Sequence, residues 1–242
     1  MNKTILVVGI GLGLSIFAAS YLWVNNNRAE ISSKALTATS AIEKVSQKDS
    51  FPSSGRQART KLGPFSHLPQ TRRGLPLESD PFVADSIEEQ EWLDRNGYPN
   101  AEQWKAYSSA SDGLLAQAAA GGDEIAAVML DGRALATGDR EAPSRLLKAA
   151  QNGSLFSLSL LQAYMAGSKK GNPSLGYSIS RVMEMMGDTR IALARDVAFS
   201  GGELSPQVRI QAEAEALNML QQLKKTSKKQ PFIDPRPFPI NQ

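Results

Sequence analysis

The fold of this chain is decided by residues 111–167, which read SDGLLAQAAAGGDEIAAVMLDGRALATGDREAPSRLLKAAQNGSLFSLSLLQAYMAG. Two apolar runs in this stretch end in glycine, and the next run opens with a polar residue, at Gly122-Asp123 and Gly153-Ser154. The same arrangement returns at Gly187-Asp188. The three glycines are 31 and 34 residues apart, a spacing typical of stacked helix pairs. The sequence therefore predicts three helix pairs.

A second set of glycines marks where the other helix of each pair is expected to end. These are Gly138, Gly167 and Gly201. Glycine readily adopts the left-handed conformation that ends many helices, so both sets suit that position. Asp123, Ser154 and Asp188 are suitable N-caps for the second helix of each pair, because their side chains can accept hydrogen bonds from its first turn.

The apolar residues inside these runs have helical spacing. Leu175, Ile179, Val182, Met183 and Met186 follow the i, i+4, i+7, i+8, i+11 pattern of a single buried face. Residues 155–165 are apolar nearly all round, which predicts a helix enclosed by neighbours in the middle of the stack.

Several of these residues resemble a known family. Gly132 and Gly138 end one run, Ala149-Ala150 and Gly153 end the next, and Tyr164, Gly167 and Gly187 repeat part of the pattern. This arrangement resembles the Sel-like repeat of the tetratricopeptide superfamily, over roughly residues 111–202. The resemblance implies a right-handed superhelix of antiparallel helix pairs, an α-solenoid, whose concave face binds proteins or peptides. It implies no catalytic residues, metal or cofactor.

Further helices are expected on both sides of the repeats. Ser86 and Asn100 each begin a capping-box pattern, with Glu89 and Gln103 three residues later. The nearby aromatic residues predict a small aromatic core, or alternatively an exposed stacking platform for a ligand. They are Trp92, Tyr98, Trp104 and Tyr107.

A longer final helix is predicted to cap the stack. It opens at Ser205-Pro206 and runs to about Leu223. The residues expected to face the stack are Val208, Ala212, Leu217, Leu220 and Leu223.

The first 24 residues predict contact with a membrane. Residues 4–24 hold no charged side chain and would span about 30 Å as a helix. Tyr21 and Trp23 favour a retained transmembrane anchor with an interfacial aromatic belt, whereas the small residues ending at Ser20 leave cleavage of a signal peptide as the alternative. Gly9 and Gly13 have the spacing of a helix-dimerisation motif, although glycine is also common in such segments.

The remaining segments are predicted to be largely disordered or extended, apart from a candidate short helix at residues 35–45. Residues 25–85 are interrupted by proline and polar residues, which predicts a disordered spacer or a basic docking segment. It holds the only histidine, His67, which has no cluster of carboxylates near it in the sequence. Residues 227–242 form a proline-rich tail, so the helical domain is expected at residues 86–226.

Composition narrows the function. The absence of cysteine excludes disulfides, thiol nucleophiles, zinc–thiolate sites and a lipoprotein anchor. The net charge of +3 is small, and the basic clusters fall outside the helical region, which argues against nucleic-acid binding.

We therefore expect an all-α, membrane-tethered, non-catalytic scaffold or adaptor that binds another protein in the cell envelope. In a bacterium it would cross the inner membrane once, with a periplasmic C-terminal domain, or be periplasmic or secreted after cleavage. One alternative is an exported inhibitor or immunity protein. Another is a cell-wall hydrolase using Glu88 with Glu91, or Glu213 with Asp196.

Overall fold

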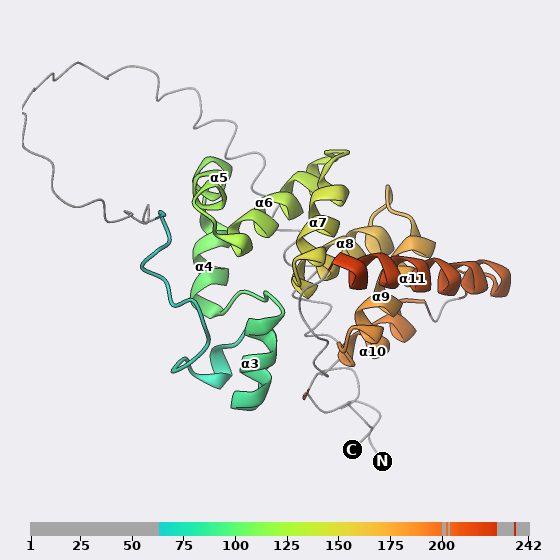
Figure 1. Cartoon of the computed structure of the whole chain (residues 1–242), viewed down its shortest axis with the longest axis horizontal. Coiled ribbons are helices and arrows are strands. Elements are labelled where there is room, and N and C mark those ends of the chain that lie inside the picture. The colour runs from blue at the N-terminus through green and yellow to red at the C-terminus, as the bar shows by residue number, and fades with distance from the viewer. Residues whose placement is uncertain (1–62, 200–201, 203, 227–234, 236–242) are drawn as a thin grey trace, which may run out of the picture. The chain divides into compact units, whose positions relative to one another are not determined.

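The computed structural model describes residues 63–199, 202, 204–226 and 235, and all regular structure within them is helical (Figure 1). The elements are a short 3-10 helix, η1 (Leu77–Ser79), followed by α3 (Ile87–Arg95), α4 (Ala101–Ser109), α5 (Asp112–Ala120), α6 (Glu124–Thr137), α7 (Ala142–Gln151), α8 (Leu155–Gly167), α9 (Pro173–Met185), α10 (Arg190–Ala198) and α11 (Pro206–Thr226).

The chain divides into two compact units, 1–61 and 62–242, and the described residues all belong to the second. The predictions for residues 4–24, for Gly9 and Gly13, and for Gly201 lie outside the described residues. So do the spacer up to residue 62 and all of the tail except Pro235. None of the helices in the described part is long and apolar enough to cross a membrane.

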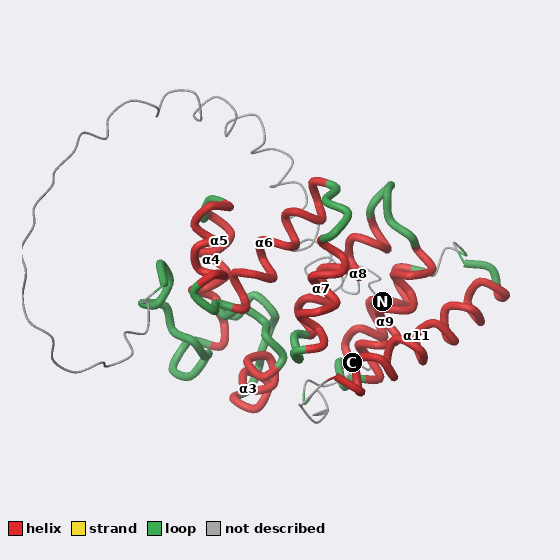
Figure 2. The backbone as a smooth tube through the Cα atoms, turned by 45° about the horizontal axis from the view of Figure 1, so that its top comes forward, coloured by secondary structure: helices red, strands yellow, loops and turns green. Residues whose placement is uncertain are grey.

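The helices pack mainly against their neighbours along the chain. Helices α5 and α6, α7 and α8, and α9 and α10 form the three pairs predicted by the sequence (Figures 1 and 2). Helix α8 packs against α6, α7 and α9, which confirms that residues 155–165 lie inside the stack. Helix α11 packs along α9 and reaches α7.

The turn inside each pair has the same construction. Gly122, Gly153 and Gly187 have φ angles of 97°, 97° and 106°, in the left-handed region. The residue after each glycine donates its backbone N–H to a carbonyl five residues earlier: Asp123 to Ala118, Ser154 to Ala149, and Asp188 to Met183. This is the bond that satisfies an otherwise unpaired helix-end carbonyl. The prediction of left-handed glycines at these turns is confirmed.

The turn between α3 and α4 is built in the same way. Gly97 has a φ angle of 72°, and the N–H of Tyr98 donates to the carbonyl of Leu93 at 3.1 Å. The turn that joins α3 to α4 therefore has the same construction as the three identified from the glycine spacing.

The second set of glycines is only partly as predicted. Gly138 ends α6 with a φ angle of 90°, as expected. Gly167 also ends α8, as predicted, but its predicted left-handed conformation is wrong, because it is the last helical residue and the helix is capped by Ser168 at a φ angle of −86°. The close approach after α8 occurs at Gly171, where a Cβ atom would lie 2.4 Å from the carbonyl oxygen of Met165.

Two of the three predicted N-caps are confirmed. The side chain of Asp123 accepts from Ala126 N–H, and that of Ser154 accepts from Ser157 N–H. Asp188 is not a cap, because α10 starts after Thr189. The Asp188 side chain is instead buried and accepts a hydrogen bond from the Tyr98 hydroxyl at 3.1 Å.

The two capping boxes ahead of the repeats also differ. Asn100 and Gln103 exchange both hydrogen bonds of the box. Ser86 accepts from Glu89 N–H, but the Glu89 carboxylate accepts from Asp85 N–H and leaves the box half formed.

The aromatic residues form a core, as predicted, and no exposed platform. Trp92 and Tyr107 are fully buried and Tyr98 is 5% exposed. Phe156 of α8 packs against Tyr98, with the two rings tilted and their centroids 5.7 Å apart. The cluster is larger than the sequence suggested and also contains Phe65, Phe82 and partly buried Trp104.

Residues 63–85, which the sequence assigns to the spacer, pack on this core. Phe65 is 7% exposed and meets the Tyr107 ring edge-on at 4.8 Å. Arg72 is fully buried. The compact unit thus begins near residue 62, ahead of the predicted boundary at 86. Proline and polar residues abolish helical periodicity, but a chain of turns can still bury single side chains.

Helix α11 buries a narrower stripe than predicted. Ala212, Ala216, Leu220 and Leu223 are buried against the stack, whereas Leu217 is 53% exposed. At 100° per residue Leu217 lies well away from the line through the other four, so the prediction for it is wrong.

Gly176, at the contact between α8 and α9, provides a test of this packing, with Gly167 at the end of α8 as its control. A Cβ atom on Gly176 would lie 2.8 Å from the backbone nitrogen of Ala166, whereas one on Gly167 would meet nothing within 4 Å. We expect Gly176→Ala to lower the free energy of unfolding by about 1–3 kcal/mol through overpacking. Gly167→Ala, the control, is expected to be neutral or stabilising by up to about 1 kcal/mol. Urea unfolding of the full chain measures both, and equal stabilities would contradict the close contact.

Candidate functional site

Three of the glycine turns meet at one edge of the helical unit. The carbonyl oxygen of Asn96, in the α3–α4 turn, accepts from the N–H of Leu155 at 3.0 Å. A Cβ atom on Gly97 would lie 3.0 Å from the hydroxyl of Ser154. Between these turns and the α5–α6 turn lies a hollow of about 280 Å³, which we call the turn-edge hollow. It is lined by Gln70, Asp94, Gly97, Gly122, Asp123, Glu124, Ile125, Gly153 and Ser154.

The local sequence explains why the hollow is polar. Helices α6 and α8 both begin there, and each starts at a side-chain cap, Asp123 or Ser154. The glycines that allow the tight turns have no side chain to fill the space. Glu124 is the first residue of α6, where the helix dipole favours a carboxylate.

Two of the three carboxylates in the hollow are already occupied. The oxygens of Asp94 accept from the backbone N–H of Arg72 at 2.8 Å and from its guanidinium at 2.6 Å. Asp123 accepts from the Tyr107 hydroxyl at 2.6 Å and from Ala126 N–H at 2.9 Å. Burial and this bond to Asp123 raise the pKa of Tyr107 well above its ordinary value, so its hydroxyl stays protonated and keeps donating.

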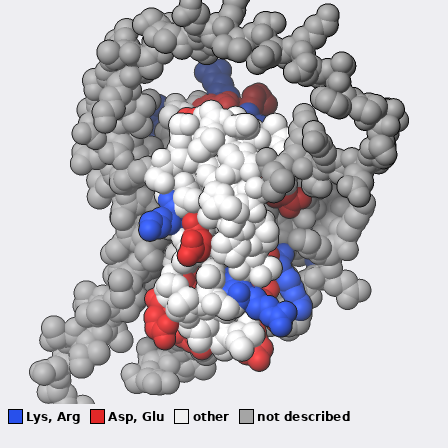
Figure 3. Space-filling model, turned by 90° about the vertical axis from the view of Figure 1, so that its left-hand side faces the viewer, with Lys and Arg blue, Asp and Glu red and all other residues white. Residues whose placement is uncertain are grey.

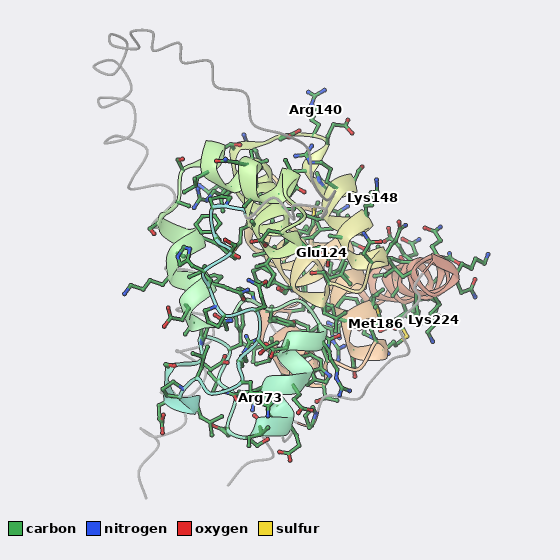
Figure 4. All side chains as sticks on the ribbon, turned by 60° about the vertical axis from the view of Figure 1, so that its left-hand side comes forward. Arg73, Glu124, Arg140, Lys148, Met186 and Lys224 are labelled. Atoms are coloured by element: carbon green, nitrogen blue, oxygen red, sulfur yellow. The ribbon has the colours of Figure 1, made fainter. Side chains whose placement is uncertain are left out.

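Glu124 differs from the other two carboxylates. Its side chain is exposed and makes no hydrogen bond or ion pair with any described residue. Figure 4 shows it well apart from Arg140, the labelled cation of the α6–α7 turn. Ile125 beside it is partly buried and gives the hollow an apolar wall. The combination can accept an alkyl chain that ends in a cation.

The repeat-defining residues fall into two groups. Gly122 and Gly153 line the hollow, and the carbonyls of Ala149 and Ala150 accept the hydrogen bonds that hold the α7–α8 turn. The others lie away from it. Gly132 lies where α6 meets α8, since a Cβ atom there would be 2.9 Å from a methyl carbon of Leu160. Tyr164 packs on the core, and Gly138 and Gly187 occupy other turns.

Sequence reasoning missed the contributions of Gln70, Asp94 and Gly97 to the hollow. A signal for Gly97 exists, because Asn96-Gly97 follows the helix predicted to start at Ser86, and glycine is typical after a helix end. Gln70 lies in the segment interpreted as spacer, where no periodic pattern indicates packing.

The carboxylate pairs considered for a hydrolase lie at other places. Glu88 and Glu91 are exposed, and Glu91 is 3.7 Å from Arg95. The Glu213 side chain accepts from Tyr177 and Arg181, and that of Asp196 pairs with Arg195. In the described part of the chain no group of three or more His, Asp or Glu residues is arranged to hold a metal.

Charge is distributed unevenly along the chain. Residues 63–226 contain 20 acidic and 16 basic residues, whereas residues 1–62 contain 3 acidic and 8 basic ones. The folded unit that holds the turn-edge hollow is therefore acidic within a chain whose total charge is +3. This balance favours a basic ligand over an anionic one.

The side of the unit near α4 and α5 is poor in charge. Figure 3 shows uncharged residues over much of this side, with acidic and basic side chains scattered between them. Helix α5 contributes one acidic residue, Asp112, and no basic one, and Leu114 is 37% exposed. Depletion of charge is typical of the central part of protein interfaces.

Comparison of the chain with protein-family models, with curated proteins and with solved structures finds no match.

Proposed function

We propose that the protein is a membrane-tethered, non-catalytic adaptor whose helical unit binds a basic segment of another protein at the turn-edge hollow. The observation that supports this is Glu124, an exposed carboxylate without a partner among the described residues, beside the apolar wall of Ile125. A lysine or arginine side chain would place its methylenes against Ile125 and its charge near Glu124.

The neighbouring groups explain why a cation is favoured there. Asp94 and Asp123 lie in the same hollow and are held in place by Arg72, Tyr107 and Ala126. Carboxylates that are already fixed lose little entropy when a cation approaches. Opposite charges also speed the encounter of two proteins, and this effect weakens as salt is added.

The proposal includes the tether and the family. Residues 4–24 would hold the protein in the inner membrane, and the segment up to residue 62 would separate the helical unit from the bilayer. The glycine turns in consecutive helix pairs support a short α-solenoid of Sel-like type. If the partner is one enzyme that binds tightly, the protein is an inhibitor of that enzyme, and it still acts by binding and not by catalysis.

Site-specific photo-crosslinking in the native host tests this function. A photoreactive residue at position 125 is expected to give one discrete adduct, and the same residue at exposed Gln221 on α11 serves as the control position. Glu124→Lys is expected to reduce the adduct yield about fivefold or more, because it replaces attraction with repulsion. An adduct pattern that is identical at both positions, or unaffected by Glu124→Lys, would contradict the proposal.

A further inference from the structure

A second hollow lies between α9, α10 and the start of α11. Its volume is about 210 Å³, and it is lined by Tyr177, Arg195, Asp196, Phe199 and Arg209. Tyr177 and Phe199 are 7% and 4% exposed, and their rings meet edge-on at 5.5 Å. This hollow therefore has a rigid aromatic floor, unlike the turn-edge hollow.

Two arginines lie over that floor. The guanidinium carbons of Arg195 and Arg209 are each 5.7 Å from the centre of the Tyr177 ring, within the range of cation–π attraction. The Tyr177 hydroxyl donates to Glu213 at 2.8 Å, which fixes the ring in its plane. Both guanidiniums are thus positioned by the same aromatic side chain.

The two arginines differ in how their charge is balanced. Arg195 is 8% exposed and pairs with Glu184 and with Asp196. Arg181, the next arginine of the cluster, pairs with Glu184 and Glu213. Arg209 is exposed, forms no ion pair with a described residue, and donates weakly to the carbonyl of Phe199 at 3.5 Å. It is the cation of this cluster that retains donors for an outside ligand.

We propose that the Tyr177–Arg195–Arg209 hollow binds a carboxylate presented by a partner protein. The planar guanidinium fork matches the two oxygens of a carboxylate. A water molecule takes about 30 Å³ of liquid volume, so a hollow of about 210 Å³ has the volume of several water molecules. This is room for one carboxylate with a short aliphatic stem. This proposal does not depend on the one made for the turn-edge hollow, so an experiment can contradict one of the two proposals and leave the other standing.

A singly charged ligand fits the surroundings better than a phosphate. Asp196 lies at the rim with its side chain 70% exposed, and Glu184 and Glu213 approach the cluster from α9 and α11. These three carboxylates pair with Arg181 and Arg195 and offset all of their positive charge, and Arg209 takes part in none of these ion pairs. A dianion would meet three negative groups and the single arginine that lies outside the ion pairs, whereas a carboxylate needs only that arginine.

Nuclear magnetic resonance of the full chain in detergent, with nitrogen-labelled arginine side chains, tests this site. The probes are acetylglycine, which has a terminal carboxylate, acetylglutamate with its main-chain carboxyl amidated, and acetylglycinamide as the neutral control. We expect the side-chain Nε–Hε resonance of Arg209 to shift saturably with one or both acids and not with the amide. If acetylglycine binds more tightly, the carboxylate is that of a chain terminus. If the amidated acetylglutamate binds more tightly, it is that of an acidic side chain.

Two variants decide whether the binding belongs to this hollow. Arg209→Gln removes the Arg209 signal, so binding to it is followed through the Nε–Hε resonance of Arg195 in the same hollow. It is expected to weaken carboxylate binding at least about tenfold, because a hydrogen bond to a charged group is lost, with the unfolding midpoint unchanged. Lys148→Gln removes an exposed cation of α7 and is expected to leave binding unchanged. The proposal is overturned if the acids give no saturable shift, or if both variants weaken binding equally. A lower unfolding midpoint for Arg209→Gln, without any acid-induced shift, would assign the arginine a structural role instead.

Discussion

Replacing Arg72 with alanine is expected to lower the free energy of unfolding by about 3–5 kcal/mol. The Arg72 side chain is fully buried and bonds Asp80, Asp94 and the carbonyls of Tyr98 and Pro99. The guanidinium thus joins the segment before α3 to the end of α3 and to the loop that leads into α4. Without it, the Asp80 side chain, 2% exposed, would keep a buried charge with no arginine beside it.

Arg73 offers a matched control for this variant. It is the next residue, it is exposed, and Arg73→Ala is expected to change stability by less than about 0.5 kcal/mol (Figure 4). Urea unfolding of the full chain, followed by tryptophan fluorescence, measures both variants. If the two substitutions lower the free energy of unfolding equally, the hydrogen bonds around Arg72 contribute no more to stability than an exposed charge does.

Replacing Phe156 with alanine is expected to have a similarly large effect, about 3–5 kcal/mol. Phe156 is 1% exposed, and its ring lies 5.8 Å from Phe82, 5.7 Å from Tyr98 and 6.4 Å from Trp104. Truncation would leave a cavity among three rings that come from different segments, and these rings cannot all move inward together. The loss should therefore exceed the transfer free energy of the side chain alone.

Phe156→Leu provides the comparison, because it keeps an apolar side chain and is expected to cost clearly less than alanine. Near-ultraviolet circular dichroism reports the packing of the Trp104 and Tyr98 rings directly, alongside the unfolding curves. A small loss for Phe156→Ala, with the aromatic signal intact, would show that the cluster closes around the missing ring.

The helix pairs could be predicted from the sequence because their signals are local. A glycine such as Gly122 or Gly153 ends a helix through its own backbone freedom, and Asp123 or Ser154 starts the next through a bond within one turn. Interactions of this kind are complete within about six residues, so residue order alone reveals them. The capping box at Asn100 was predicted correctly for the same reason.

The errors concern contacts between distant residues. Asp188 has the local features of a cap, but the Tyr98 hydroxyl, 90 residues away, occupies it instead. Leu217 is apolar and helical, yet the phase of α11 is set by Ala212, Ala216 and Leu220. Arg72 reads as one of many basic residues in a proline-rich segment, and its burial depends on Asp94 and the Pro99 carbonyl.

The candidate sites were harder to predict from the sequence than the helices, because they form only when distant segments meet in the tertiary structure. The turn-edge hollow needs three turns to meet, and periodicity does not show which turns become neighbours. The sequence did mark Gly122, Asp123, Gly153 and Ser154 as special positions, which are four residues of its lining. It gave no indication that Glu124 would remain exposed and unpaired among them.

The bond from Leu155 N–H to the Asn96 carbonyl limits how this stack can change in length. In a simple repeat array each unit meets only the next, so a unit can be duplicated or deleted in the middle. Here the turn at Asn96 meets the turn before α8 across the intervening pair of α5 and α6. An inserted pair at that point would separate the two turns, so a change in length between α4 and α7 would break this contact.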